Sequence, residues 1–209
     1  MSTQVINSVK TYKNVIFDLG AVLVKWDPKE LVRHLKREDP SVSDSLLEIP
    51  QTEAWKNFDK GFYSIQDVLV ALQDTYPRRH VKMFIEGMYK TQLQPLSEGL
   101  DLFYAVKSRG YKMFVLSNFS KETFERCYNN YSFLHDLDGA VFSHAIGLAK
   151  PDPEIYFYLL ENYRLKPEEC LFIDDLAVNI QAAKCIGIDG IVCDNHEKVR
   201  MVLEQKGVL

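Results

Sequence analysis

The amino-acid sequence predicts an α/β protein, in which a parallel sheet is sandwiched by helices and a small all-α domain is inserted. Three observations support this fold class. Short apolar runs that suit buried strands alternate with helical patterns from residue 95 to the end of the chain. A similar apolar run at residues 15–17 stands alone near the N-terminus. Between these two parts, residues 28–92 have helical periodicity only.

The expected strands are residues 15–17, 111–116, 139–143, 170–173 and 188–193. Helical patterns separate the last four of them, and connections of this kind join parallel strands. The helical segment that follows the first strand has no strand of its own, so we interpret it as an insertion between the first and second strands. The expected domains are an α/β core of residues 1–27 and 93–209 and a helical cap of residues 28–92.

Composition and charge exclude several classes of protein. The chain has 209 residues, of which 46% are hydrophobic, and a formal net charge of −4 without a long run of one sign. This charge argues against a nucleic-acid partner, and no apolar stretch approaches the roughly 20 residues of a membrane span. The first residues do not resemble a secretory signal, and the four cysteines form no C-x-x-C pair. We therefore expect a cytoplasmic protein without disulfides or zinc, and its oligomeric state stays open.

The first candidate for chemistry is Asp18, which directly follows the apolar run of residues 15–17. Open α/β sheets bind their ligands at the carboxyl ends of the strands. A carboxylate there is desolvated, which is costly unless a partner such as a divalent cation compensates its charge. Taken alone, an Asp in this position is equally well explained as an ordinary strand-ending or capping residue.

Three later segments also place polar residues at strand ends or in the loops beyond them. V-L-S-N ends with Ser117 and Asn118, G-L-A-K-P-D-P contains Lys150, and L-F-I-D-D ends with Asp174 and Asp175. Taken alone, the serine is better explained as the cap of the next helix. Because parallel strands end at the same edge of a sheet, we expect all five side chains to converge on the first carboxylate.

The segment F-D-L-G-A-V-L at residues 17–23 and these three later segments, in the same order, resemble the four motifs of the haloacid dehalogenase-like hydrolases. That superfamily is built around a nucleophilic Asp. The resemblance covers residues 13–26 and 95–193, while the helical block matches the family's helical cap only in position and type. It implies a Rossmann-like core and points to the branch of sugar-phosphate phosphatases and of the N-terminal phosphatase of epoxide hydrolases.

The resemblance also implies a metal site and a covalent mechanism. Asp18 would attack phosphorus in line, and water would later hydrolyse the aspartyl-phosphate. Mg²⁺ would be bound by Asp18, the Gly20 carbonyl and Asp175, with Asp174 as the supporting neighbour. If the register of the last motif is shifted by one residue, Asp174 and Asp175 exchange these roles.

The expected substrate is a small phosphate ester, such as a hexose 1-phosphate. Ser117, Asn118 and Lys150 would hold the equatorial phosphate oxygens, together with backbone N–H groups near Gly20 and Ala21. This set of donors follows from the resemblance, as the metal ligands do.

One position departs from the family pattern. Phosphatases of this family usually carry a second Asp two residues after the nucleophile, as general acid, and this chain has Gly20 there. A positioned acid contributes about 10²–10⁴-fold in rate. Three consequences stay open: Asp27 near the cap hinge or Asp59 in the cap replaces this acid, the leaving group needs little help, as in an anomeric or acyl phosphate, or catalysis is weak. We favour the substrate with an easy leaving group.

Two rival functions stay open. A 2-haloacid dehalogenase-type hydrolase would use the same Asp nucleophile on carbon without a metal, and such relatives also lack the second Asp. They do not usually need the paired carboxylates of Asp174 and Asp175. A weakly active phospho-ligand-binding homologue is supported only by Gly20. A dinucleotide-binding function is excluded, because no G-x-G-x-x-G follows any expected strand.

Overall fold

The structure is a computed structural model that describes residues 11–209. Its sheet has five parallel strands in the order β3-β2-β1-β4-β5. The strands are β1 (Asn14–Phe17), β2 (Lys112–Ser117), β3 (Gly139–Phe142), β4 (Cys170–Asp174) and β5 (Asp189–Val192). All five lie within a residue or two of the expected positions, and the predicted α/β class is confirmed.

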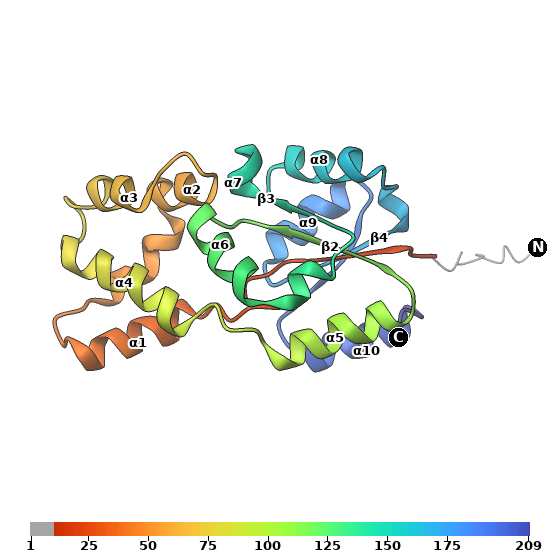
Figure 1. Cartoon of the computed structure of the whole chain (residues 1–209), viewed down its shortest axis with the longest axis horizontal. Helices are drawn as coiled ribbons and strands as arrows, with labels where there is room; N and C mark the ends of the chain where they lie inside the picture. The colour runs from red at the N-terminus through yellow and green to blue at the C-terminus, as the bar shows by residue number, and fades with distance from the viewer. Residues whose placement is uncertain (1–10) are drawn as a thin grey trace, which may run out of the picture.

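Helices cover both faces of this sheet (Figure 1). On one face lie α5 (Ser97–Ser108) and α10 (His196–Gln205), and on the other lie α8 (Pro153–Tyr163) and α9 (Ala177–Cys185). Alternate strand residues point to opposite faces, so Phe17 packs on Phe103 of α5 and Phe172 packs on Tyr156 of α8. The remaining core elements are α6 (Lys121–Asn130), η2 (Ser132–His135), α7 (Ser143–Ile146) and η3 (Pro167–Glu169).

The segment between β1 and β2 is helical in the structure. It forms α1 (Pro28–Glu38), η1 (Asp44–Gln51), α2 (Glu53–Asp59), α3 (Ile65–Ala71) and α4 (Arg78–Thr91). These helices lie beyond the carboxyl ends of the strands (Figure 1). The caps explain where two of them begin, because Asp27 caps α1 ahead of Pro28, and Ser64 and Asp67 form a capping box on α3.

Two chain segments connect these helices to the sheet, and they run side by side. The backbone N–H of Lys25 donates to the carbonyl of Gln94 (2.7 Å), and that of Leu93 donates to the carbonyl of Lys25 (3.1 Å). The fully buried Gln92 side chain accepts from the N–H of Asp27 at 2.8 Å. We keep the division into a core and a cap of residues 28–92 as an interpretation of this arrangement. Among the residues that the structure describes, no helix is long and apolar enough to cross a membrane.

Candidate active site

The predicted site residues lie at the carboxyl edge of the sheet because each one ends a strand or follows it. Asp18 continues β1 by one residue, and its N–H donates to the carbonyl of Ile173 at 2.8 Å. Ser117 is the last residue of β2, and Asp174 is the last residue of β4. β1 lies between these two strands in the sheet, so the nucleophile candidate is flanked on both sides.

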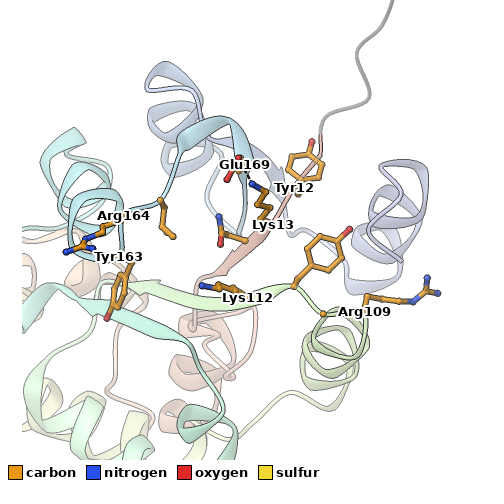
Figure 2. Close-up of a pocket in the computed structure, with 11 residues that line it drawn as sticks. Tyr12, Lys13, Arg109, Lys112, Tyr163, Arg164 and Glu169 are labelled. Atoms are coloured by element: carbon orange, nitrogen blue, oxygen red, sulfur yellow. Dashed lines mark hydrogen bonds and ion pairs between the residues drawn. The ribbon is translucent and has the colours of Figure 1, made fainter.

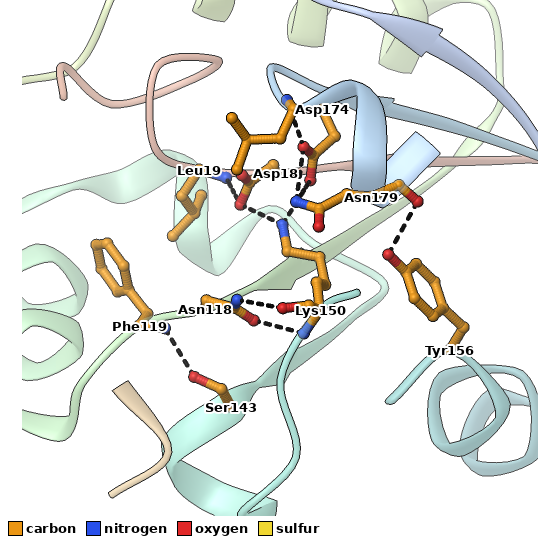
Figure 3. A network of polar contacts seen from close by, with 10 residues as sticks. Asp18, Leu19, Asn118, Phe119, Ser143, Lys150, Tyr156, Asp174 and Asn179 are labelled. Atoms are coloured by element: carbon orange, nitrogen blue, oxygen red, sulfur yellow. Dashed lines mark hydrogen bonds and ion pairs between the residues drawn. The ribbon is translucent and has the colours of Figure 1, made fainter. Parts of the chain in front are cut away.

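Lys150 lies between two of the carboxylates (Figure 3). Its Nζ is 2.9 Å from Oδ1 of Asp18 and 2.6 Å from Oδ2 of Asp174. The lysine side chain is only 1% exposed, so these ion pairs are shielded from solvent. Because solvent does not screen these charges, the ammonium interacts with its two carboxylate partners far more strongly than a solvated surface lysine would.

Asn118 holds the backbone of Lys150 in place. Its Oδ1 accepts from the N–H of Lys150 at 2.8 Å, and its Nδ2 donates to the Lys150 carbonyl at 2.9 Å. Both ends of this amide are therefore engaged within the protein. The resemblance predicts that Asn118 binds phosphate, whereas in the structure its side chain positions the lysine.

The two adjacent carboxylates after β4 have different surroundings. Asp174 is fully buried and accepts from the N–H of Leu176 (2.8 Å), from Nδ2 of Asn179 (2.9 and 3.1 Å) and from Lys150. Asp175 is partly exposed. The assignment of Asp175 as the main metal ligand stays a prediction, and the many protein partners of Asp174 agree with its expected supporting role.

The charges of these groups are strongly coupled. Burial raises the pKa of Asp18 to about 6, since the attraction of Lys150 only partly offsets desolvation and the negative charge of Asp174 adds to it. Burial, followed by the charges of Asp18 and Asp174, raises the pKa of Asp175 to about 7. Burial alone would lower the pKa of Lys150, but the two carboxylates that it contacts outweigh this and raise it, so the lysine stays protonated.

These carboxylates fit a divalent cation. Asp18, Asp174 and Asp175 each offer an oxygen, and the three oxygens lie within 4.8 Å of one another. When all are ionised, three carboxylates and one ammonium leave two negative charges uncompensated, which is the charge that a divalent cation balances. Mg²⁺ prefers such hard oxygen ligands, few in number, with water completing its shell.

The loop after Asp18 is tightly turned. The N–H of Leu19 donates to Oδ1 of Asp18 at 2.7 Å, and Ala21 has a φ of 58°, in the left-handed region. The N–H of Ala21 donates to the carbonyl of Val24 at 2.8 Å. This predicted phosphate donor is therefore already engaged, and it would have to leave Val24 to bind a ligand.

Sequence reasoning missed the structural roles of two residues. Ser143, the polar residue directly after β3, accepts from the N–H of Phe119 at 2.8 Å and donates to the backbone carbonyl of Asp59. Its position after a strand is the signal that would have found it. Asn179, in the first turn of α9, anchors Asp174, and the hydroxyl of Tyr156 in turn donates to the Asn179 carbonyl at 3.0 Å.

A separate hollow of about 580 Å³ lies at the opposite edge of the sheet (Figure 2). Lys13 and Lys112 from the starts of β1 and β2 line it, together with Glu169, which is paired with Lys13 at 2.8 Å. None of the predicted catalytic residues lines it. The carboxyl edge around Asp18 is therefore the better candidate for the active site.

Residues 12–187 match the haloacid dehalogenase-like hydrolase family, and the chain belongs to it. The predicted family is thus confirmed, and so is the prediction that the protein is an enzyme of the hydrolase class. The match spans both the strand-end residues of the candidate site and the helical segment between β1 and β2.

Two relatives align with nearly the whole chain. A sesquiterpene phosphatase from Aspergillus oryzae is 27% identical over 198 residues, covering 93% of this chain and 96% of that protein. A D-ribitol-5-phosphate phosphatase from Bacteroides thetaiotaomicron is 26% identical over 202 residues, covering 91% of this chain and 96% of that protein.

Among solved structures, the chain resembles a HAD family enzyme from Bacteroides thetaiotaomicron, crystallised in complex with magnesium and inorganic phosphate. The TM-score is 0.68 at 22% identity, covering 87% of this chain and 93% of that one. At this identity the likeness shows the shared fold.

Proposed function

We propose that the protein is a Mg²⁺-dependent phosphatase that acts on a small phosphorylated metabolite, such as a hexose 1-phosphate, through an aspartyl-phosphate on Asp18. The observation that carries this proposal is the cluster of Asp18, Asp174 and Asp175 around the buried Lys150. The phosphatase names of the two relatives that align along the chain support it.

Each residue of the cluster has a role that follows from its contacts. The bonds from Leu19 and Lys150 converge on Oδ1 of Asp18, so the other oxygen, Oδ2, would attack phosphorus. Lys150 would offset the charge that the phosphoryl group brings into this buried site. Ser117 has a single O–H, whose interaction with Asp18 favours the ionised form of the nucleophile; on substrate binding this O–H would turn to donate to a phosphate oxygen.

Asp18, Asp175 and the Gly20 carbonyl would hold Mg²⁺, with Asp174 fixed behind them by Asn179. When bound, the ion would offset the repulsion between an anionic nucleophile and an anionic substrate. The alternative of a carbon–halogen hydrolase leaves these carboxylates unexplained. Such an enzyme needs no metal, and three crowded carboxylates without a cation only add electrostatic cost.

The test is phosphate release from a nitrophenyl phosphate, a hexose 1-phosphate and a primary alkyl phosphate, with Mg²⁺ and with a chelator. We expect turnover that needs Mg²⁺ and is lost in Asp18→Asn. Asp101→Asn, which changes an exposed carboxylate on α5, is the matched control and should keep full activity. Turnover that persists in Asp18→Asn, or no turnover of any ester, would contradict the proposal, and haloacids would then be tested.

A further inference from the structure

Gly20 stands where phosphatases of this family usually carry their general acid, and the structure shows what lies beside it. A Cβ built on Gly20 would lie 3.7 Å from the Cβ of Trp26 and 3.8 Å from its ring. A side chain at residue 20 would therefore point toward the indole of Trp26. Trp26 lies beside this position, and its indole cannot supply a proton to a leaving group.

The same indole connects this position to a carboxylic acid in the cap. Trp26 stacks on Trp55 of α2, with ring centroids 6.3 Å apart and an interplanar angle of 20°. Asp59 lies four residues after Trp55, on the same side of the helix, and the Trp55 side chain lies close enough to its carboxylate to counteract part of the effect of burial on its pKa. The aromatic pair thus spans the distance between the vacant position at Gly20 and the side chain of Asp59.

The core fixes the backbone of Asp59 over the carboxyl edge of the sheet. Ser143 donates to the Asp59 carbonyl and accepts from the N–H of Phe119, in the loop that follows Ser117. Two residues further, Gly61 approaches the core so closely that a Cβ on it would lie 2.6 Å from the carbonyl oxygen of His144. α2 lies beside α7 as a result (Figure 1).

The carboxyl group of Asp59 lies close enough to the nucleophile to be affected by its charge. Burial, and then the negative charge of Asp18, raise the pKa of Asp59 well above its ordinary value, so this carboxyl tends to keep its proton. The other acid that the sequence suggested is engaged elsewhere. Oδ1 of Asp27 accepts from the N–H of Glu30 at 2.9 Å and caps α1.

We propose that Asp59 is the acid that protonates the leaving group, supplied by the cap instead of by the loop after the nucleophile. This inference rests on the proposed phosphatase function and deepens it. As the bond from Asp18 to phosphorus forms, the bond from phosphorus to the ester oxygen breaks, and its electron pair stays on that oxygen. The oxygen takes the proton of Asp59 and leaves as an alcohol, and Asp59 becomes a carboxylate.

The second half of the reaction restores both groups. A water molecule attacks phosphorus of the aspartyl-phosphate and gives one proton to the Asp59 carboxylate. The acyl–phosphate bond breaks, Asp18 leaves as a carboxylate, and inorganic phosphate is released. With this acid in place, the enzyme does not depend on an easy leaving group. An alkyl phosphate is therefore open to this enzyme as well as the hexose 1-phosphate of the proposed function.

The test compares Asp59→Asn with the wild-type enzyme on a nitrophenyl phosphate and on a primary alkyl phosphate. The nitrophenolate leaves without a proton, whereas an alkoxide needs one. We expect kcat/KM for the alkyl ester to fall about 10²–10³-fold, while that for the nitrophenyl ester falls less than about 10-fold. Asp74→Asn, which changes an exposed carboxylate of the cap, is the control and should alter neither value.

The outcomes separate this inference from the proposed function. Equal losses for both esters, which a purely structural role would give, or no loss for either would overturn the role of Asp59 while leaving the phosphatase intact. No turnover of any ester by the wild type would overturn both. If Asp59→Asn does not fold, the rates of the wild-type enzyme are measured on a series of esters whose leaving groups differ in pKa. Rates that change little as the leaving-group pKa rises support the acid, and a steep fall overturns it.

Discussion

Lys150→Met tests whether the Lys150 ammonium offsets the energetic cost of burying the carboxylates of Asp18 and Asp174. The substitution keeps an unbranched side chain of similar length but removes the ammonium that lies 2.9 Å from Asp18 and 2.6 Å from Asp174. Removing one partner of a buried ion pair costs about 3–5 kcal/mol, because the remaining charge is left without compensation. We expect the free energy of unfolding to fall by about 3 kcal/mol at pH 8 in the presence of a chelator.

The loss should depend on pH. Even beside Lys150, burial raises the pKa of Asp18 to about 6, and without the lysine it rises further. A carboxyl whose pKa is higher in the folded state than in the unfolded state binds protons on folding. The free energy of unfolding that it costs therefore grows as the pH rises from the unfolded-state pKa through the folded-state pKa. The loss in Lys150→Met should therefore be smaller at pH 5 than at pH 8, as measured by urea unfolding at both values.

Two variants control this measurement. Lys150→Met combined with Asp174→Asn removes one of the two carboxylates that lose their ammonium partner, and it should recover part of the lost stability at pH 8. Lys198→Met breaks an exposed pair, in which Lys198 lies 2.8 Å from Asp194, and should cost less than about 1 kcal/mol. If Lys150→Met costs no more than Lys198→Met, the account of the buried cluster is wrong.

Two further predictions concern stability. Burial acts to raise the pKa of Asp189, but hydrogen bonds from Lys206 and Tyr12 outweigh it and lower the pKa. Asp189→Asn should therefore lower the free energy of unfolding by about 1–2 kcal/mol at pH 7, as measured by urea unfolding. This loss should become progressively smaller below about pH 4, where the carboxyl group is protonated in the unfolded state. Gly61→Ala should cost more than Gly110→Ala in the same assay, since both have positive φ but only Gly61 faces a close backbone oxygen; equal costs would argue against this close contact of the cap.

The sheet edge could be predicted from the sequence because it depends on local patterns. Strands of four to six residues, each largely apolar and each ending in a polar residue or followed by one, place Asp18, Ser117 and Asp174 together without knowledge of any loop path. The positions where α1 and α3 begin could also be predicted, because Pro28 and Ser64 are local start signals.

What the sequence could not predict depends on how distant segments dock. Asn118 brackets Lys150 only because the loop before Lys150 returns to β2, and no local pattern encodes that path. The approach of Asp59 depends on Ser143 and on the contact between Gly61 and α7. The sequence also does not show which aromatic side chains of residues 28–92 are buried, and in the structure Trp55 is buried while Phe62 is 63% exposed.

The most direct test of the central claim is to look for phosphate bound to Asp18. The wild-type enzyme is mixed with excess nitrophenyl phosphate and Mg²⁺, quenched in acid during turnover and digested for mass spectrometry. We expect a phosphoryl group on the peptide that contains Asp18, and none on that peptide when a chelator replaces Mg²⁺ or when Asp18→Asn is used. Phosphate release without any phosphorylated peptide, or phosphorylation of another residue, would contradict the account.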